Sequence, residues 1–317
     1  MKKYFYGVLI LMVITSGSNS ILAQYNRVAM DSAYIVSLTS QWKGERLTDG
    51  RPFVSDKLLE RLKHVVLTHA WGALRKNKFN NQYQDNWMMI NPDSNTVMTG
   101  RVVTAQYMPL RPDFGDLIRK VGLAEGHGSK AQSNVWPIEM LQDGDVYVAD
   151  GFAKVKEGTL IGDRLANSIY SKTKRGVIFW GTVRNIQVIK KIQGFNGWIL
   201  GDHPSSLTEV MLTSINAPIR IGDVTVLPGD VVFASPYGTL FFPAYLVAEI
   251  VLEAEIGNLQ HEFGIMQNRA GKWTTGQIDS GYSAEMTKLF YDYLRKKTDA
   301  ELPMSREELN DYLDAHK

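Results

Sequence analysis

The 317-residue chain contains no cysteine. It therefore has no disulfide framework, no thiolate zinc site and no cysteine nucleophile, and the absence of thiols is compatible with an oxidising compartment. The chain also has no Gly-x-Ser-x-Gly sequence and no Gly-x-Gly-x-x-Gly sequence. These absences argue against a serine-hydrolase elbow and against a dinucleotide-type or methyl-donor turn.

An excess of charge of one sign is missing as well. Lysine and arginine number 35 and aspartate and glutamate number 33, which gives a formal net charge of +2. Lys2 and Lys3 account for the charges before Ala23, so without that leader the chain is close to neutral. Nucleic-acid phosphates attract surfaces rich in Lys and Arg, and the composition predicts no such surface. We therefore expect no nucleic-acid partner.

The N-terminus carries a short apolar run where a membrane span would need a long one. Residues 8–14 are all apolar, come after Lys2 and Lys3, and are followed by small and polar residues up to Ala23. A membrane-spanning helix needs about 20 apolar residues. The pattern is typical of a secretory signal peptide over residues 1–23, cleaved after Ala23; an uncleaved N-terminal anchor is the alternative. We expect a periplasmic or secreted protein with no membrane attachment after cleavage.

The rest of the chain divides into a polar segment over 24–50, an α/β domain over 51–250 and a C-terminal helical extension over 251–317. The domain alternates short apolar runs with amphipathic segments, which predicts an α/β unit with a mixed, partly parallel sheet. We expect strands over residues 98–107, 146–149, 176–183, 197–200, 224–227, 231–234 and 239–242. We expect helices over 56–77, with Ser55 as N-cap, over 163–171 and over 186–191. A loop is predicted over 79–95, a surface insertion over 115–134, and hairpin turns at 228–230 and 236–238.

The C-terminal extension has the pattern of amphipathic helices. Met286, Leu289, Phe290, Tyr293 and Leu294 recur at helical spacing and predict a packing face. The sequence Ser-Arg-Glu-Glu from residue 305 predicts a capping box at the start of the last helix.

Two segments of the domain carry the residues most suited to binding an anion. Residues 158–166 read as a glycine turn that opens a helix at Asp163, and residues 181–185 close a strand with Arg184. Twenty residues separate Asp163 from Arg184. A helix N-terminus offers free N–H groups and a positive dipole end, and an arginine can grip a carboxylate with a planar pair of donors. Together they suggest an organic acid as the ligand.

From Arg51 to Pro243 the chain resembles the family of the regulator of ribonuclease activity A and the 4-hydroxy-4-methyl-2-oxoglutarate aldolases. That family carries an Asp, twenty residues, then Arg-Asp, and here the pattern stands as Asp163, twenty residues, Arg184-Asn185. The supporting segments are residues 144–150, 176–181 and 221–232. The resemblance implies a layered β/β/α swivelling-type domain with a mixed sheet, and a ring-like homo-oligomer, a trimer or hexamer.

The resemblance also implies a chemistry and the roles of individual residues. The aldolases cleave or decarboxylate 2-oxo acids through a pyruvate enolate with the help of a divalent metal, Mg²⁺ or Mn²⁺. Asp163 and Arg184 are the implied catalytic residues. Asn185 stands where the family has its metal-ligating aspartate, and an amide oxygen lacks that negative charge. The implied substrate-binding residues are Gly162, Asp163, Arg164, Leu165 and Arg184, and the carboxylates that could compensate for Asn185 are Asp150, Asp202 and Glu209.

Two functions are compatible with these residues and with the resemblance. One is a metal-assisted lyase, of aldolase or decarboxylase type, that acts on a small 2-oxo or hydroxy acid. The other is a non-catalytic protein on the same scaffold that binds an organic acid or regulates a partner. The aromatic residues Trp180, Trp198, Phe241 and Phe242 are the candidates for contact area between subunits.

The leader sequence generates a prediction about export. Expressed with its leader in a Gram-negative host, the protein should appear in the periplasm with an N-terminus near Gln24, because the apolar core and the small residues before Ala23 match what signal peptidase cleaves. Intact-mass measurement of the periplasmic and cytosolic fractions tests this. A soluble cytosolic protein that retains Lys2 would contradict it.

Overall fold

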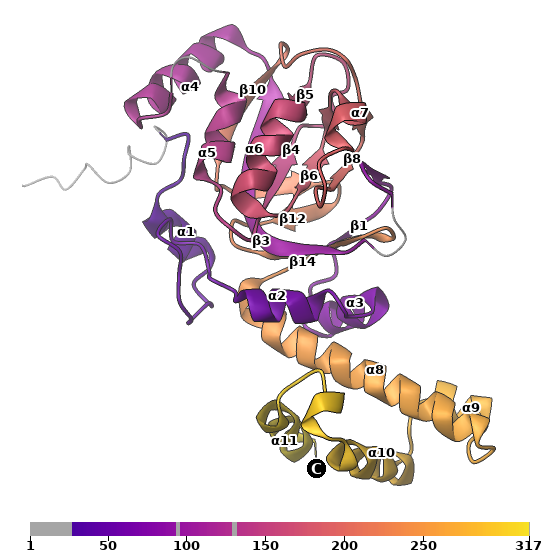
Figure 1. Ribbon diagram of the computed structural model, residues 1–317. Helices are drawn as coiled ribbons and strands as arrows, with labels where there is room; N and C mark the ends of the chain where they lie inside the picture. Colours follow the sequence, from indigo (N-terminus) through magenta and orange to yellow (C-terminus); the bar gives the residue numbers. More distant parts are fainter. Residues whose placement is uncertain (1–26, 93–95, 129–131, 317) are drawn as a thin grey trace, which may run out of the picture.

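The computed structural model describes residues 27–92, 96–128 and 132–316, and the predicted signal peptide lies outside them (Figure 1). A nine-stranded mixed sheet forms the centre, in the order β1-β14-β13-β3-β4-β6-β8-β2, with β10 paired to β3. The strands β3, β4, β6 and β8 run parallel to one another, and the others pair antiparallel. The bounds are β1 Tyr83–Gln84, β2 Met88–Met89, β3 Met98–Pro109, β4 Asp145–Asp150, β6 Val177–Trp180, β8 Gly197–Ile199, β10 Val210–Ile215, β13 Val231–Ser235 and β14 Gly238–Phe242.

The central strands are buried on both faces, as parallel strands usually are. Every residue of β4 is buried. One face, with Tyr147 and Phe179, packs against the helices α5 (Trp136–Met140), α6 (Asp163–Thr173) and α7 (Ile186–Ile189). The other face, with Val148 and Trp198, packs against a hairpin of β11 (Ile219–Ile221) and β12 (Val224–Val226). These layers confirm the predicted α/β class with a mixed sheet.

The helix predicted over 56–77 is two helices, α2 (Asp56–Leu62) and α3 (Leu67–Lys76). Ser55 caps α2 as predicted, with its Oγ accepting from the Leu58 N–H at 3.3 Å. The break has a packing cause: Val65 is buried in a cluster with α8, and the turn that carries it uses short-range hydrogen bonds that cannot continue an α-helix.

Half of the surface insertion predicted over 115–134 is the helix α4 (Pro112–Ala124), with Pro112 at its start. Gly122, within this helix, has a packing role. A Cβ added to Gly122 would lie 2.3 Å from the Trp136 ring, so this glycine lets α4 approach α5. The glycine marks close helix packing where sequence pattern indicated a loop. A 3-10 turn, Ser133–Val135, then leads into α5.

Three smaller expectations also need correction. The strand predicted over 176–183 splits at Gly181 into β6 and β7 (Thr182–Val183), which belong to different sheets. The turn at 228–230 does not close a hairpin, because β12 pairs with β11 while β13 pairs with β14 and β3. The predicted loop over 79–95 contains the two edge strands β1 and β2. The turn at 236–238 does join β13 to β14 as predicted.

The C-terminal helices lie beyond the sheet, with the long helix α8 leading away from it (Figure 1). The predicted boundary at residue 250 falls inside α8, and Leu289 of the predicted packing face is exposed. The capping box of Ser305 and Glu308 is present as predicted. Among the described residues no helix is long and apolar enough to cross a membrane. The remaining bounds are α1 Ser32–Leu38, α8 Val247–Arg269, α9 Thr275–Asp279, α10 Ala284–Lys296 and α11 Arg306–Ala315.

Three of the four aromatic residues offered as subunit contacts are core residues. Trp198, Phe241 and Phe242 have no exposed surface, and Trp180 packs beside the same core. Their side chains fill the space between sheet and covering elements. Trp198, Phe241 and Phe242 are therefore unavailable as contact area between subunits.

A buried ion pair ties the N-terminal segment to the sheet. Both guanidinium Nη atoms of Arg51 donate to the carboxylate of Asp145 at 2.9 Å, and neither side chain has exposed surface. The Nε of Arg51 donates to Asp49 at 2.6 Å, and Asp145 also accepts from the Gln142 N–H. The start of β4 is thereby fixed against the chain that precedes α2.

The buried pair generates a stability prediction. Asp145→Asn should lower the free energy of unfolding by about 3–5 kcal/mol, because it leaves the buried Arg51 guanidinium without its bidentate carboxylate and with Asp49 as its remaining charged partner. Urea denaturation followed by circular dichroism measures the change. The control is Asp292→Asn, which removes an exposed pair with Arg295 and should change stability by no more than about 1 kcal/mol. Equal losses in the two variants would contradict the prediction.

Candidate functional site

A small parallel sheet brings the two predicted segments together. Its strands are β5 (Thr159–Ile161), β7 and β9 (Gly201–Asp202). β5 pairs with β7, and the Arg184 N–H donates to the Ile161 carbonyl at 2.9 Å. Since Gly162 follows Ile161 directly, the helix that Gly162 opens starts beside Arg184.

The start of α6 is open to a ligand. Gly162 is the N-cap in an extended conformation, and no side chain of the described part of the chain caps the helix. The first intrahelical bond runs from the Ala166 N–H to the Gly162 carbonyl. The N–H groups of residues 163–165 therefore stand at the positive end of the helix dipole without an intrahelical acceptor. Such an end favours a bound anion.

The side chain of Arg184 lies across this helix start. A Cβ added to Gly162 would be 3.1 Å from the Arg184 Nε and 3.2 Å from its Cγ. The missing side chain at Gly162 is therefore what leaves room for the guanidinium stem. The Arg184 Nη1 donates to the Ser206 Oγ at 3.1 Å. This bond orients the guanidinium, and the remaining N–H groups of Arg184 are available to a ligand.

Asp163 and Asn185 form a hydrogen-bonded pair at the same place. The Asn185 Nδ2 donates to the Asp163 Oδ1 at 2.7 Å. This bond lowers the pKa of Asp163 below its ordinary value, and the nearby charges of Arg164 and Arg184 act in the same direction. Asn185 has a φ of 59°, in the left-handed region where asparagine and aspartate are enriched. The carboxylate of Asp163 is thus charged at neutral pH.

These groups line one open cavity of about 650 Å³. The structure places all the predicted binding residues, and Asn185, on its wall. Sequence analysis missed other wall residues, among them Asn134, whose Nδ2 donates to the Leu160 carbonyl at 2.7 Å. No motif marks such residues, because they reach the cavity from distant segments. The wall consists of Gln132, Asn134, Val135, Thr159, Leu160, Ile161, Gly162, Asp163, Arg164, Leu165, Arg184, Asn185 and Leu207.

The described wall of the cavity offers few charged ligands for a divalent cation. Asp163 is the single carboxylate on the described wall, and two arginines stand beside it. The described residues contain no group of three or more His, Asp or Glu arranged to hold a metal. Asp150 instead accepts from the Phe152 N–H at 2.8 Å. Mg²⁺ is usually held through one or two carboxylates and several waters, and the described wall offers it one carboxylate beside two positive charges.

The other two carboxylates considered from sequence are also not on this wall. Glu209 pairs with Lys154, whose Nζ donates to it at 2.6 Å. Asp202 is exposed on β9. None of the three carboxylates considered from sequence therefore lies on the wall beside Asn185.

A comparison with known families decides the relationship. A family model described as RraA-like, Aldolase/RraA, matches residues 54–240. The chain belongs to the RraA-like family. The match includes β5, α6 and β7, the elements that carry the cavity.

Individual relatives share a shorter part of this RraA-like chain. A protein of Hahella chejuensis named "Putative 4-hydroxy-4-methyl-2-oxoglutarate aldolase" is 33% identical over 100 residues, which is 32% of this chain and 60% of that protein. A protein of the same name from Ectopseudomonas mendocina is 27% identical over 109 residues, 34% of this chain and 66% of its own length. The chain thus matches slightly under two thirds of each of these relatives.

Solved structures of similar fold cover more of the chain. RraAS2 of Streptomyces coelicolor, described as an unusual member of the RNase ES inhibitor RraA protein family, superposes with a TM-score of 0.57 at 24% identity. It covers 68% of this chain and all of its own. An uncharacterized protein of Pseudomonas syringae gives a TM-score of 0.57 at 20% identity, over 73% of this chain and 98% of its own. These likenesses establish the fold.

The geometry around Arg184 generates a binding prediction. Arg184→Ala should weaken the binding of a small organic anion by about 2–3 kcal/mol, because it removes charge-assisted hydrogen bonds while the backbone donors of α6 remain. Isothermal calorimetry with pyruvate measures the loss. Arg184→Lys should recover little, since an ammonium cannot form the planar pair of bonds.

A matched control is Arg295→Ala, which alters an exposed arginine on a C-terminal helix. It should bind pyruvate as the unaltered protein does. Equal pyruvate affinity in Arg184→Ala and the unaltered protein would remove Arg184 from the site.

Proposed function

We propose that this protein is a carbon–carbon lyase, of aldolase or decarboxylase type, that binds a small 2-oxo or hydroxy acid in the cavity at the start of α6. The observation that carries the proposal is the position of Arg184 across an uncapped helix N-terminus, beside the charged Asp163. The names of the aldolase relatives give the reaction class its independent support.

The cavity suits the charge that such a reaction develops. The N–H groups at the start of α6 hold the substrate carboxylate, and the Arg184 guanidinium bonds the 2-oxo oxygen. When the bond beyond C3 breaks, its electron pair moves into the pyruvate-like fragment and the negative charge collects on that oxygen. Donors that already point at this oxygen stabilise the transition state more than the substrate.

Asp163 is the group that handles the proton. In an aldol cleavage the substrate hydroxyl loses its proton as the new carbonyl forms, and the enolate carbon later gains one. The Asp163 carboxylate is a stronger base than water even with its lowered pKa, so it accepts the hydroxyl proton through one bridging water and returns it to the enolate carbon by the same route. The bond from Asn185 fixes the orientation of Asp163 for this task.

The family resemblance implies Mg²⁺ or Mn²⁺, and we infer that this chain departs from its relatives there. Asn185 presents an uncharged amide, and its Nδ2 is used to bond Asp163. The steps above therefore rest on Arg184 and the helix N-terminus.

Asn185 also supports the second candidate function, a non-catalytic protein that binds an organic acid or regulates a partner. In that case the cavity holds the acid, but no bond breaks. Turnover separates the two functions, because both predict binding and one predicts pyruvate release.

Export of the protein and its assembly into a trimer or hexamer are part of the proposal as well. The leader sequence supports export, and the family resemblance supports the ring. Light scattering of the mature protein at micromolar concentration measures the assembly, and a monomer would overturn that part.

The deciding experiment is an assay for pyruvate release. Oxaloacetate and aldol adducts of pyruvate are offered to the mature protein, with lactate dehydrogenase as the detector, in EDTA and in Mg²⁺. We expect release that Arg184→Ala abolishes and that EDTA leaves largely intact. Binding without release from any acid would favour the second candidate function, and release that requires Mg²⁺ would overturn the metal-independent mechanism.

The pair of Asp163 and Asn185 generates a further prediction. Asn185→Asp should lower the melting temperature in EDTA, because two carboxylates then face each other and the pKa of one of them rises. Mg²⁺ should reverse this loss and bind more tightly than to the unaltered protein, since a charged ligand has been added. Thermal melts and calorimetry with MgCl₂ measure both effects.

The control for this variant is Asn80→Asp, an exposed position outside the cavity wall. It should show no Mg²⁺-dependent change. An Asn185→Asp protein that is equally stable with and without Mg²⁺ would contradict the prediction.

A further inference from the structure

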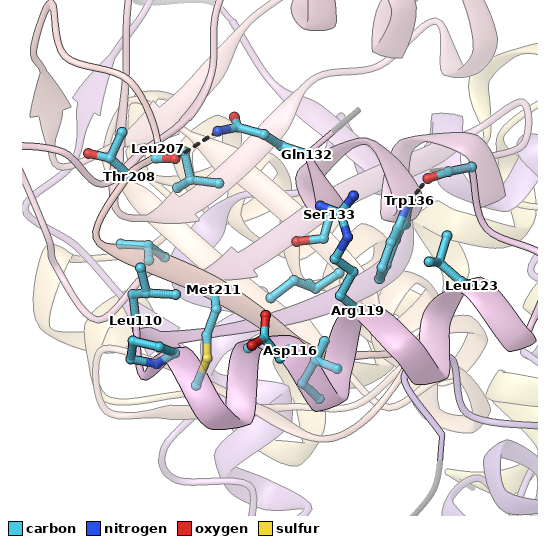
Figure 2. Close-up of a pocket in the computed structure, with 16 residues that line it drawn as sticks. Leu110, Asp116, Arg119, Leu123, Gln132, Ser133, Trp136, Leu207, Thr208 and Met211 are labelled. Carbon is cyan, nitrogen blue, oxygen red and sulfur yellow. Dashed lines mark hydrogen bonds between the residues drawn. The ribbon is translucent and has the colours of Figure 1, made fainter. Parts of the chain in front are cut away.

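A second cavity of about 460 Å³ lies next to the first, between α4 and β10 (Figure 2). Figure 2 shows side chains from α4, from β10 and from the start of α5 around one hollow. Most of them are apolar. The apolar side chains that define it are Leu110, Ile118, Leu123, Trp136, Val210 and Met211.

The two cavities share a wall made of Gln132 and Leu207, which line both. The Gln132 Nε2 donates to the Leu207 carbonyl at 3.0 Å, and this bond is drawn in Figure 2. Gln132 is an exposed side chain, so a single side-chain hydrogen bond spans part of the boundary. The two cavities therefore adjoin at Gln132 and Leu207, and a chain that extends from the first cavity past these residues enters the second.

The walls of the second cavity suit hydrocarbon. Trp136 is 2% exposed, and its one polar atom, Nε1, already donates to the Gly128 carbonyl at 3.2 Å. The indole therefore offers only its apolar ring to a ligand. The charged groups on the wall are Asp116 and Arg119, which are of opposite sign, one helical turn apart on α4 and exposed. A second carboxylate of a ligand would meet repulsion from Asp116 as well as attraction to Arg119.

We propose that the second cavity is the subsite for an apolar tail of the substrate. The ligand class is then a 2-oxo or hydroxy acid whose acid end sits at Arg184 and whose unbranched hydrocarbon chain passes Gln132 and Leu207. This inference rests on the proposed organic-acid site and names its substrate class. Pyruvate alone occupies only the first cavity.

The first experiment measures affinity against chain length. Calorimetry with pyruvate, 2-oxobutyrate, 2-oxohexanoate and 2-oxooctanoate should show affinity rising about two- to fourfold for each methylene that leaves water for the second cavity. 2-Oxoadipate, which matches 2-oxohexanoate in length but ends in a carboxylate, should gain nothing over pyruvate.

The second experiment fills the cavity. Gly115 lies on α4 in the wall, and a Cβ there would be 3.4 Å from Leu110 Cδ1 and 3.8 Å from Met211 Sδ, ordinary contacts. Gly115→Leu therefore keeps the helix and occupies the space meant for the tail. Its affinity for 2-oxooctanoate should fall to that for pyruvate, while pyruvate binding stays unchanged. Gly72→Leu, an exposed helical glycine of α3 with no atom near its Cβ, is the matched control and should keep the chain-length dependence.

Four outcomes would overturn the inference in different ways. Equal affinities across the series, with pyruvate still bound, would overturn the tail subsite and leave the organic-acid site standing. Preference for 2-oxoadipate would make the second cavity an anion subsite. A change of oligomeric mass in Gly115→Leu, seen by light scattering, would show that a second copy of the chain covers this face. Loss of binding for every acid, pyruvate included, would overturn the proposed function itself.

Discussion

The parallel pairing of β5 with β7 decides where the functional groups of this protein meet. The hydrogen bond from the Arg184 N–H to the Ile161 carbonyl aligns the end of one strand with the end of the other. β5 is followed by Gly162, which opens α6, and β7 is followed by Arg184 and Asn185. Were the pairing shifted by one residue, the side chain of Arg184 would point to the opposite face of the strand and lose the helix start.

Electrostatics at this junction favour an anion. One carboxylate stands among two arginines and a helix N-terminus, so positive charge exceeds negative. Beside these charges Asn185 is a hydrogen-bond donor toward Asp163, where the family resemblance implies a carboxylate. The Asn185 amide stabilises the charged form of Asp163.

The packing of α4 against α5 shapes the second, apolar cavity. Gly122 allows α4 to lie close to Trp136, which draws the helix over the end of β10 and encloses the apolar cavity beside the anion site. The two cavities differ in chemistry because they are built from different elements: one from strand ends and a helix start, the other from apolar side chains of α4, α5 and β10. An acid with an apolar chain matches this pair of environments, with its charge at one end and its hydrocarbon at the other.

The sequence by itself determined the α/β class, most strands at the centre and the helix at Asp163, because alternating burial and glycine turns are local signals. Six of the thirteen residues on the cavity wall were also predicted, from the Asp163 and Arg184 segments and from the family resemblance that these segments carry. Tertiary structure alone decided the rest. The sequence pattern around Gly122 indicated a surface insertion, and only the folded structure shows that this glycine packs against the Trp136 ring. Asn134 and Leu207 reach the anion cavity from segments far apart in the chain. The role of Asn185 likewise depends on a contact with Asp163 across 22 positions. A local pattern cannot encode which distant side chain will occupy the space beside it, because packing fixes those neighbours only when the whole chain has folded.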